Sequence, residues 1–260
     1  GATPLHGASG KGHSDIIQLL LANKADVNKA NNNGETPLCK ASIEGHSSIV
    51  QLLLANNADV NKANKWGETP LWWASGDGLI DTTQLLIANN ADVNKADNED
   101  WTPLHCASYW GHSNVVQLLL TSNADVNIAD NRGEIPLHWA SGKGHIGVVQ
   151  LLLANNADVN KEENGGKTPL YWATGEGHID VVQLLLDNNA DVNKANYDGE
   201  TPLYWASESG HIDIIQLLLA NSADMNKADH NGQTPLCKAS GEGYSDIVQL
   251  LLANNADVNE

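Results

Sequence analysis

Hydrophobic and polar positions follow one another along the chain in a pattern that is typical of short, paired helices, as residues 196–228 illustrate. Pro202 suits the first position of a helix, the apolar residues after it share one face, and Gly210 is typical of a helix end. The segment 214–219, Ile-Ile-Gln-Leu-Leu-Leu, then gives a second helix a wide apolar stripe. The pattern predicts two helices of about ten residues, each too short to be stable alone.

The same pattern returns every 33 residues along the whole chain. Thr-Pro-Leu begins the first helix of seven units, and Ile135 takes the place of the threonine in the other one. Ala-Asp-Val-Asn follows the second helix at the same interval, with Met225 once in place of valine. The chain thus divides into units 1–30, 31–63, 64–96, 97–129, 130–162, 163–195, 196–228 and 229–260. Self-similarity at this period predicts a single stacked array over residues 1–260, in which each unit buries its apolar faces against its neighbours.

The stretch GETPLYWASESGHIDIIQLLLANSADMNKA, residues 199–228, resembles the ankyrin repeat, and the likeness extends over residues 1–260. The resemblance rests on the Thr-Pro-Leu helix start, the Gly-His hinge between the helices and the Ala-Asp-Val-Asn segment. It implies an all-α fold: an ankyrin-repeat solenoid of stacked helix-turn-helix units with projecting β-hairpin-like loops. It also implies that the loop tips and first helices line a concave groove.

Several units depart from the pattern. Leu79 replaces the hinge histidine of the third unit, and Thr82 and Thr83 stand where other units carry valine or isoleucine, so we expect two hydroxyls in the core that need partners. Asp100 replaces a turn glycine in the fourth unit. Both terminal units resemble interior ones, which predicts a segment of a longer array and end-to-end self-stacking through uncapped repeats. An idealised, designed scaffold is the alternative, which the irregular third and fourth units disfavour.

Composition narrows the classes of partner. Lys and Arg number 14 against 32 Asp and Glu, a formal charge of −18, so nucleic acid and anionic membranes are poor partners. No apolar run approaches the roughly 20 residues of a membrane helix, and we expect no direct membrane insertion. Three cysteines far apart in sequence indicate reduced thiols and a cytoplasmic protein rather than a disulfide framework.

Candidate catalytic and metal-binding residues follow the repeat instead of converging on one place. His105 and Cys106 are the one adjacent His–Cys pair, but equivalent residues of neighbouring units should lie on the order of 10 Å apart, too far for one zinc ion. We expect these histidines, and those of the Gly-His hinge, to hydrogen-bond within the repeats. No phosphate loop or nucleophile elbow is present, so we expect no catalysis, no metal and no cofactor.

The asparagine that ends each Ala-Asp-Val-Asn segment has two interpretations. In the ankyrin family this position can be hydroxylated by an asparaginyl hydroxylase, and the resemblance makes five of these residues candidate targets. They are Asn61, Asn94, Asn127, Asn160 and Asn193. The simpler interpretation, which we favour, is that the side chain hydrogen-bonds the backbone of the loop.

Aromatic residues are the strongest candidates for partner binding. Four tryptophans share one position of the repeat, where other units carry Lys40 and Lys238, so we expect their rings to be at least partly exposed. Three other aromatic residues, in the fourth unit, stand where the related units mostly carry Gly, Glu or Lys, and Trp66 stands at a loop tip where others carry residues such as Asn33 and Arg132. Exposed Trp and Tyr are typical of interface hot spots. The candidate binding residues are Trp66, Trp73, Trp101, Tyr109, Trp110, Trp139, Trp172 and Trp205.

These observations favour a non-catalytic protein–protein interaction module that holds a protein segment on its concave face. Acidic residues around the aromatic positions favour a basic or amphipathic segment, with its Arg or Lys among Trp66, Trp101 and Trp110. Stacking of neighbouring tryptophans to stiffen the array is the alternative explanation of the shared position. At the level of function, an architectural or elastic segment of a long array is the alternative.

Overall fold

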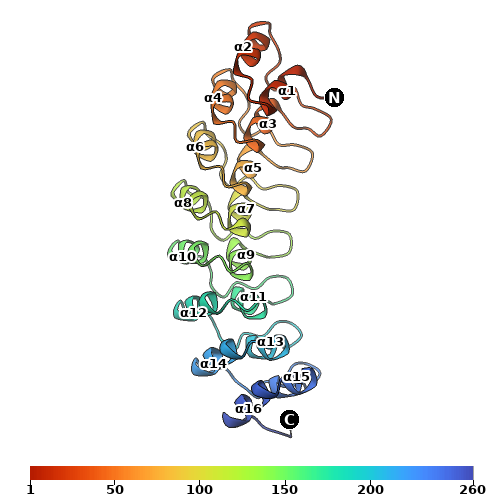
Figure 1. Cartoon of the computed structure of the whole chain (residues 1–260), viewed down its shortest axis with the longest axis vertical. Helices are drawn as coiled ribbons and strands as arrows, with labels where there is room; N and C mark the ends of the chain where they lie inside the picture. Colours follow the sequence, from red (N-terminus) through yellow and green to blue (C-terminus); the bar gives the residue numbers. More distant parts are fainter. Residues whose placement is uncertain (260) are drawn as a thin grey trace. The chain divides into compact units, whose positions relative to one another are not determined.

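The computed structural model describes residues 1–259, which hold sixteen α-helices and no strand (Figure 1). The first helices of the units are α1 (Pro4–Gly10), α3 (Pro37–Ile43), α5 (Pro70–Gly76), α7 (Pro103–Trp110), α9 (Pro136–Gly142), α11 (Pro169–Gly175), α13 (Pro202–Ser209) and α15 (Pro235–Glu242). The second helices are α2 (Ser14–Ala22), α4 (Ser47–Ala55), α6 (Ile80–Ala88), α8 (Ser113–Thr121), α10 (Ile146–Ala154), α12 (Ile179–Asp187), α14 (Ile212–Ala220) and α16 (Ser245–Ala253). The predicted all-α architecture of successive helix pairs is confirmed.

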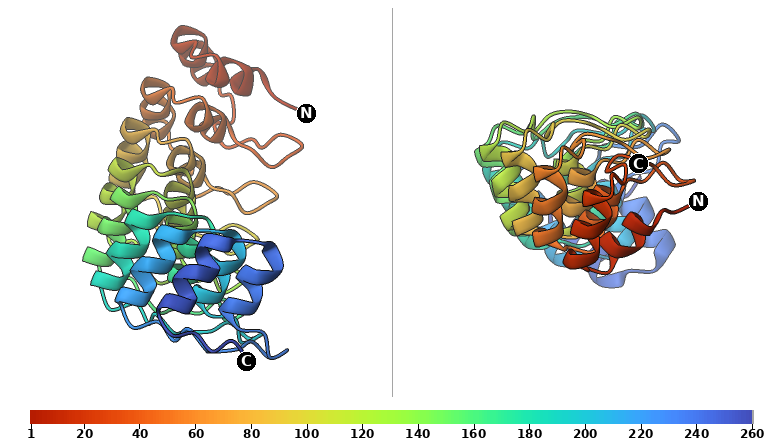
Figure 2. Two further views of the ribbon diagram at one scale, coloured as in Figure 1. Left: turned by 60° about the horizontal axis from the view of Figure 1, so that its bottom comes forward. Right: turned by 90° about the horizontal axis from the view of Figure 1, so that it is seen from above.

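The chain forms two compact parts, residues 1–131 and 132–260. In the first part, the odd-numbered helices α1 to α7 contact one another in sequence, and the even-numbered helices α2 to α8 do the same. The second part repeats this arrangement with α9 to α16, and in both parts the loops project on the side of the odd-numbered row (Figures 1 and 2). Each part is thus a stack of four helix pairs. The single array over residues 1–260 stays a prediction.

The Thr-Pro-Leu motif begins each first helix as expected. The Oγ1 of Thr201 accepts a hydrogen bond from the backbone N–H of Tyr204 at 3.1 Å, and Pro202 fills the first helical position. Where Ile135 replaces the threonine, its backbone N–H instead donates to Nδ1 of His138 at 3.1 Å. These helices are seven or eight residues long and the second helices nine, somewhat shorter than the pattern predicted.

Left-handed residues end the second helices and shape the turns. Asn57 and Asn156 both have φ of 64°, so asparagine substitutes there for the glycine that usually follows a helix. In the fourth unit, Asp100 adopts φ of 63° in place of the glycine that other units carry. The loops between units are turns in residues 1–259, tied to each other by single backbone bonds such as Lys65 N–H to the Asn33 carbonyl at 2.9 Å.

The core lies between the two rows of helices in each part. Val181, Val182 and Leu185 of α12 are buried against neighbouring helices, as the apolar stripe predicted. Thr82 and Thr83 of α6 occupy the same register and are equally buried. The Oγ1 of Thr83 has no hydrogen-bond partner among residues 1–259, so the third unit carries an unsatisfied buried hydroxyl.

Histidines have the structural roles that were expected. The Nδ1 of His105 lies 2.8 Å from Oγ1 of Thr102 and accepts from its backbone N–H at 3.2 Å, which closes a capping box at the start of α7. The hinge histidines reach the preceding unit, where Nε2 of His112 bonds the Gly76 carbonyl at 2.9 Å and that of His211 the Gly175 carbonyl at 3.1 Å. These histidines therefore join neighbouring units within each part.

The asparagine that ends the Ala-Asp-Val-Asn segment forms hydrogen bonds to the next unit. The Oδ1 of Asn160 accepts from the backbone N–H of Asp191 at 2.8 Å, and its Nδ2 donates to the Asn189 carbonyl at 3.2 Å. Asn28 and Asn193 make the same pair of bonds. The side chain binds backbone groups as expected, but it links two units rather than closing its own loop.

The three cysteines differ in accessibility, and we expect them to differ in reactivity. Burial raises the pKa of Cys39 to about 12 and raises the pKa of Cys106 well above its usual value, whereas Cys237 is exposed. A maleimide added to the native chain at neutral pH should therefore label Cys237, and label the other two after denaturation. Peptide mapping of the labelled sites checks this result. Equal labelling of Cys39 without denaturant would contradict its burial.

Candidate functional site

The predicted binding residues fall into two groups by exposure. Trp66 at a loop tip is 52% exposed and Trp110 at the end of α7 is 62% exposed. The other six are half-buried: Trp73, Trp101, Tyr109, Trp139, Trp172 and Trp205. The partial exposure expected for the four tryptophans of the shared position is confirmed.

Two tryptophans of the shared position, Trp172 and Trp205, pack against the residue 30 positions earlier, in the preceding unit. A Cβ atom added to Gly142 would lie 2.7 Å from Cε3 of Trp172, and one added to Gly175 would lie 1.7 Å from Nε1 of Trp205. One unit later, the same two positions hold Glu208 and Lys238, whose charged groups pair at 2.7 Å. In this part of the chain a tryptophan ring thus lies over a glycine of the preceding unit, and a lysine pairs with a glutamate of the preceding unit.

Contacts between rings support the stacking of neighbouring tryptophans in part. Trp139 and Trp172 meet edge to face with ring centroids 5.2 Å apart. In the first part, Trp73 instead meets its neighbour Trp72 in the same unit, at 5.1 Å. The indole nitrogens of Trp72, Trp73 and Trp172 are buried and have no acceptor among the described residues. These rings therefore contribute apolar contact more than hydrogen bonds.

Three of the predicted residues form one cluster at α7, which we call the aromatic cluster: Trp101, Tyr109 and Trp110. The rings of Tyr109 and Trp110 meet edge to face at 4.9 Å, and the rings of Trp101 and Tyr109 lie 5.7 Å apart. The Trp110 ring lies beside Gly76 of the preceding unit, where an added Cβ atom would be 4.0 Å from its Cδ1, an ordinary van der Waals contact. The cluster presents Trp110 to solvent from a packed base.

Trp101 also has a role inside the stack that comparison of the units did not predict. Its Nε1 donates to the carboxylate of Asp130, in the next loop, at 3.0 Å. Its ring stacks on His105 with centroids 6.0 Å apart and an interplanar angle of 27°. Its own backbone N–H donates to Asp97 at 2.9 Å. Trp101 is therefore held in place from two sides, and the exposed surface of the cluster comes mainly from Trp110.

Carboxylates surround the aromatic cluster. Asp97 and Asp130 bond Trp101, and Asp77 follows Gly76, the glycine beneath Trp110. Burial raises the pKa of Asp97, and the negative charges of Glu99 and Asp100 add to the rise while backbone hydrogen bonds oppose it. Burial likewise raises the pKa of Asp77. The first part thus carries an acidic surface, and a bound cation would reduce the repulsion between its carboxylates.

A second aromatic site lies in the other part of the chain, in a cavity of about 190 Å³ that we call the lysine cleft. Its lining residues are Lys167, Tyr171, Trp172, Glu176 and Trp205. The rings of Tyr171 and Trp205 stack at 5.6 Å, and the Lys167 ammonium lies 5.4 Å and 5.7 Å from their centroids. Both cation–ring distances are within the range of an attractive interaction.

Sequence reasoning missed two residues of this cleft, Lys167 and Tyr171, as well as Tyr197. Tyr197 is 62% exposed at a loop tip, where its ring lies against Gly166 of the preceding loop. Comparison of the units could have found all three, because most units carry other residues at each position: most have glutamate where Lys167 stands, and most have a polar residue where Tyr197 stands.

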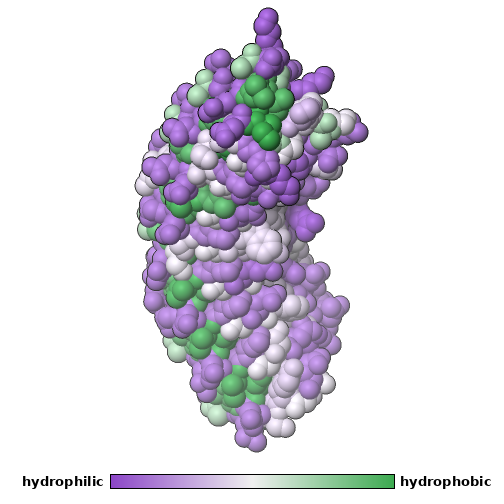
Figure 3. All heavy atoms as spheres, turned by 45° about the horizontal axis from the view of Figure 1, so that its top comes forward, coloured by the Kyte–Doolittle hydropathy of each residue, from purple (hydrophilic) through white to green (hydrophobic). Residues whose placement is uncertain are grey.

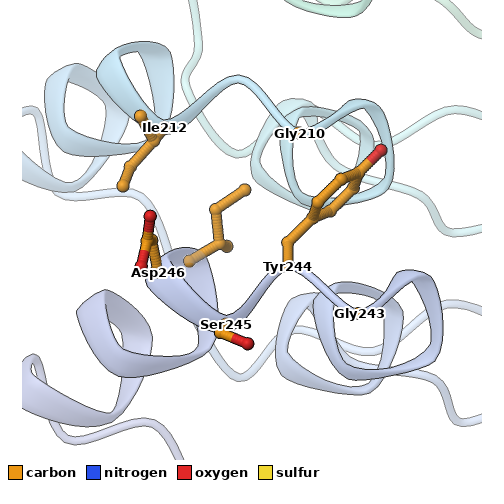
Figure 4. A pocket seen from close by; sticks show the side chains of 7 residues that line it. Gly210, Ile212, Gly243, Tyr244, Ser245 and Asp246 are labelled. Atoms are coloured by element: carbon orange, nitrogen blue, oxygen red, sulfur yellow. The ribbon is translucent and has the colours of Figure 1, made fainter.

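A larger cavity, of about 350 Å³, lies away from both aromatic sites, at the hinge between α14 and α16 (Figure 4). Gly210, Ile212, Tyr244 and Asp246 are among its lining residues, and the Tyr244 ring stands over Gly210. Similar cavities recur at equivalent hinges, one of about 310 Å³ beside His112. A cavity that returns with the repeat follows from the hinge geometry, so we assign it no separate function.

The surface drawn in Figure 3 is mostly hydrophilic, with apolar residues in separate patches. Among residues 1–259 no group of three or more His, Cys, Asp or Glu side chains is arranged to hold a metal ion. No helix in this range has the length and apolar character that a membrane crossing requires.

Comparison with known proteins agrees with the architecture. A family model described as ankyrin repeats, three copies, matches residues 1–64, 56–130, 122–196 and 191–260. A search of curated proteins found no match. The matched segments cover the chain from end to end, and they coincide with stacked helix pairs that are joined at their hinges. The chain therefore belongs to the ankyrin-repeat family.

Proposed function

We propose that this chain is a non-catalytic protein-binding array whose aromatic cluster holds a basic segment of a partner protein. Ankyrin repeats are in general protein–protein interaction modules and are typically non-enzymatic. The observation that carries the proposal is the exposure of Trp110, 62%, on a base of packed aromatic rings. A large ring that the core does not bury, held rigid by its neighbours, is the usual anchor of a binding hot spot.

Charge supports a basic partner. The cluster lies among Asp77, Asp97 and Asp130, two of which have raised pKa values because of burial. An arginine over the face of Trp110 would gain a cation–ring interaction and would also lie near these carboxylates. The formal charge of −18 over the chain steers basic segments toward it.

Trp66 extends the proposal to the loop tips. Its ring is 52% exposed, and its backbone carbonyl is fixed by the N–H of Asn98 in the next loop at 2.9 Å. The half-buried tryptophans of the shared position are proposed as secondary contacts. Part of their ring surface already packs against other residues of the array, so less of it is available to a partner.

The proposal is tested by selecting peptides from a random display library against the folded chain, and measuring the affinity of the best binder for Trp110→Ala. We expect the selected peptides to be rich in Arg and Lys, and Trp110→Ala to weaken binding by more than about 1 kcal/mol, roughly fivefold or more. Binding should also weaken as salt is raised. Calorimetry or surface plasmon resonance gives both values.

Tyr197→Ala is the matched control, because Tyr197 is equally exposed but lies outside the aromatic cluster. Its affinity should equal that of the wild type. Selected peptides without basic residues, or equal binding by Trp110→Ala, would refute the proposed site. A library that yields no binder at all would favour the architectural alternative. End-to-end self-stacking stays a prediction that sedimentation of the chain at increasing concentration can test.

A further inference from the structure

We propose that the lysine cleft is a separate binding site for one acidic side chain, glutamate or aspartate, of a partner segment. The inference rests on the proposal that the chain binds proteins, but it assigns a second site and the opposite charge preference. Its ligand group is a carboxylate, received by the Lys167 ammonium, with the aliphatic stem of the side chain against the rings of Trp172 and Trp205.

Lys167 lacks the carboxylate partner that three other lysines of the chain have. Lys40 pairs with Glu35 at 3.0 Å, Lys194 with Glu162 at 3.3 Å, and Lys238 with Glu208 at 2.7 Å. Lys238 also stands over a tyrosine ring, that of Tyr204, at 5.3 Å, so it shares the ring contact but not the unpaired charge. Within residues 1–259 the Lys167 ammonium contacts two rings and pairs with no carboxylate.

A half-buried ammonium without an anion is costly unless something compensates it. The rings of Tyr171 and Trp205 compensate in part, because cation–ring attraction stabilises the ammonium beside them. Ring faces leave the three N–H groups of the ammonium without strong acceptors. An incoming carboxylate supplies those acceptors, and it does so without breaking an ion pair.

The walls of the cleft are rigid, which favours binding over rearrangement. The Tyr171 hydroxyl donates to Glu200 at 2.8 Å, and the Trp205 ring lies against Gly175. Trp172 is held edge to face against Trp139, with ring centroids 5.2 Å apart. A volume of about 190 Å³ suits a single side chain and is below the usual range for a small-molecule site.

The charge of Lys167 disfavours a basic side chain in the cleft. A basic side chain that entered the cleft would meet the Lys167 ammonium at close range, and like charges repel. Glu176 also lines the cleft, is exposed and forms no ion pair with Lys167. Its negative charge repels an acidic ligand and so weakens its binding. Removing the charge of Glu176 should therefore strengthen binding of a carboxylate, which gives the proposal a prediction of opposite sign to that for Lys167.

The test uses the full chain with ¹⁵N-labelled tryptophan and three blocked pentapeptides, acetyl-Ala-Leu-X-Leu-Ala-amide, with X as Glu, Gln or Lys. The indole N–H signals of Trp172 and Trp205, assigned by single Trp-to-Phe exchanges, report binding in the cleft. We expect the Glu peptide to shift them at lower concentration than the Gln peptide, and the Lys peptide to leave them unmoved. Lys167→Met should weaken the Glu peptide about tenfold, and Glu176→Gln should tighten it.

Lys238→Met is the matched control, since Lys238 also lies over a tyrosine ring but already has its carboxylate. It should leave the affinity for the Glu peptide unchanged. Equal shifts with the Glu and Lys peptides, no shift with any peptide, or an unchanged affinity in Lys167→Met would each overturn the inference. Loss of peptide binding at Trp110 leaves these signals unaffected, so failure of the proposed function and failure of the lysine cleft are told apart.

Discussion

Replacing Gly175 with alanine should lower the free energy of unfolding by about 2 kcal/mol, although alanine is the better helix former. The new Cβ atom would lie 1.7 Å from Nε1 of Trp205, far closer than two non-bonded atoms can approach, so the indole has to leave its place. Its stacking on Tyr171, with centroids 5.6 Å apart, would be lost with it. These losses exceed the gain of about 1 kcal/mol that alanine brings to a helix.

Gly241→Ala is the matched control, because Gly241 occupies the same position of the last unit and a Cβ atom there meets nothing within 4 Å. That variant should be neutral or slightly more stable. Urea unfolding followed by circular dichroism gives the difference between the two variants, and amide hydrogen exchange shows whether α11 and α13 are the helices that loosen. Equal stability of the two variants would show that Trp205 moves aside without cost.

Sequence periodicity predicted the parts of the structure that each unit determines for itself. Pro202 and Gly210 bound a first helix as expected, and Asn57 is left-handed after a second one, because caps and turns depend on residues a few positions apart. Thr82 and Thr83 were placed in the core from their register alone. Because the pattern is repeated along the chain, an exception in one unit does not change the register of the others, and these features can be predicted from register alone.

The contacts between units were less predictable. Gly142 faces Trp172, and Glu208 pairs with Lys238, at an offset of 30 residues that the period of 33 does not reveal. The bond from Trp101 to Asp130 likewise joins positions 29 apart. Such offsets follow from how the helices of adjacent units lie against each other, which is a property of packing. Reading paired positions in successive units, glycine with tryptophan or glutamate with lysine, is the signal that could have found them.

That offset also bears on what the candidate sites can do. A ring that fills the space over a glycine, as Trp205 does over Gly175, is fixed by the scaffold and can form a wall. A ring such as Trp110, which is 62% exposed, retains a face for a partner. Lys167 also lies over aromatic rings, but it lacks the carboxylate partner that Lys238 has. The Lys167 ammonium can therefore pair with an external carboxylate. In both proposals, the binding site lies where the pairing between units is incomplete.

Thr83→Val should stabilise the chain by about 1 to 2 kcal/mol. Valine has nearly the shape of threonine, and the equivalent residues Val116 and Val182 are fully buried in their own units. The Thr83 hydroxyl is buried and has no partner among residues 1–259, so its removal ends a desolvation penalty of about 1 to 3 kcal/mol without breaking a hydrogen bond. The third unit would then match its neighbours at this core position.

Thr174→Val separates this effect from a general preference for valine. Thr174 is also fully buried, but its Oγ1 donates to the Leu170 carbonyl at 2.7 Å, so the same exchange there removes a bond and should destabilise the chain or leave it unchanged. Because stability in a stack is a sum of unit and neighbour terms, the gain at Thr83 should appear first as slower amide exchange in α6 and the helices that contact it, α4, α5 and α8. A rise in the urea midpoint for Thr83→Val but not for Thr174→Val would locate the weak joint of the first part in the third unit. A fall for Thr83→Val would mean that its hydroxyl has a partner, such as an ordered water, whose loss outweighs the gain.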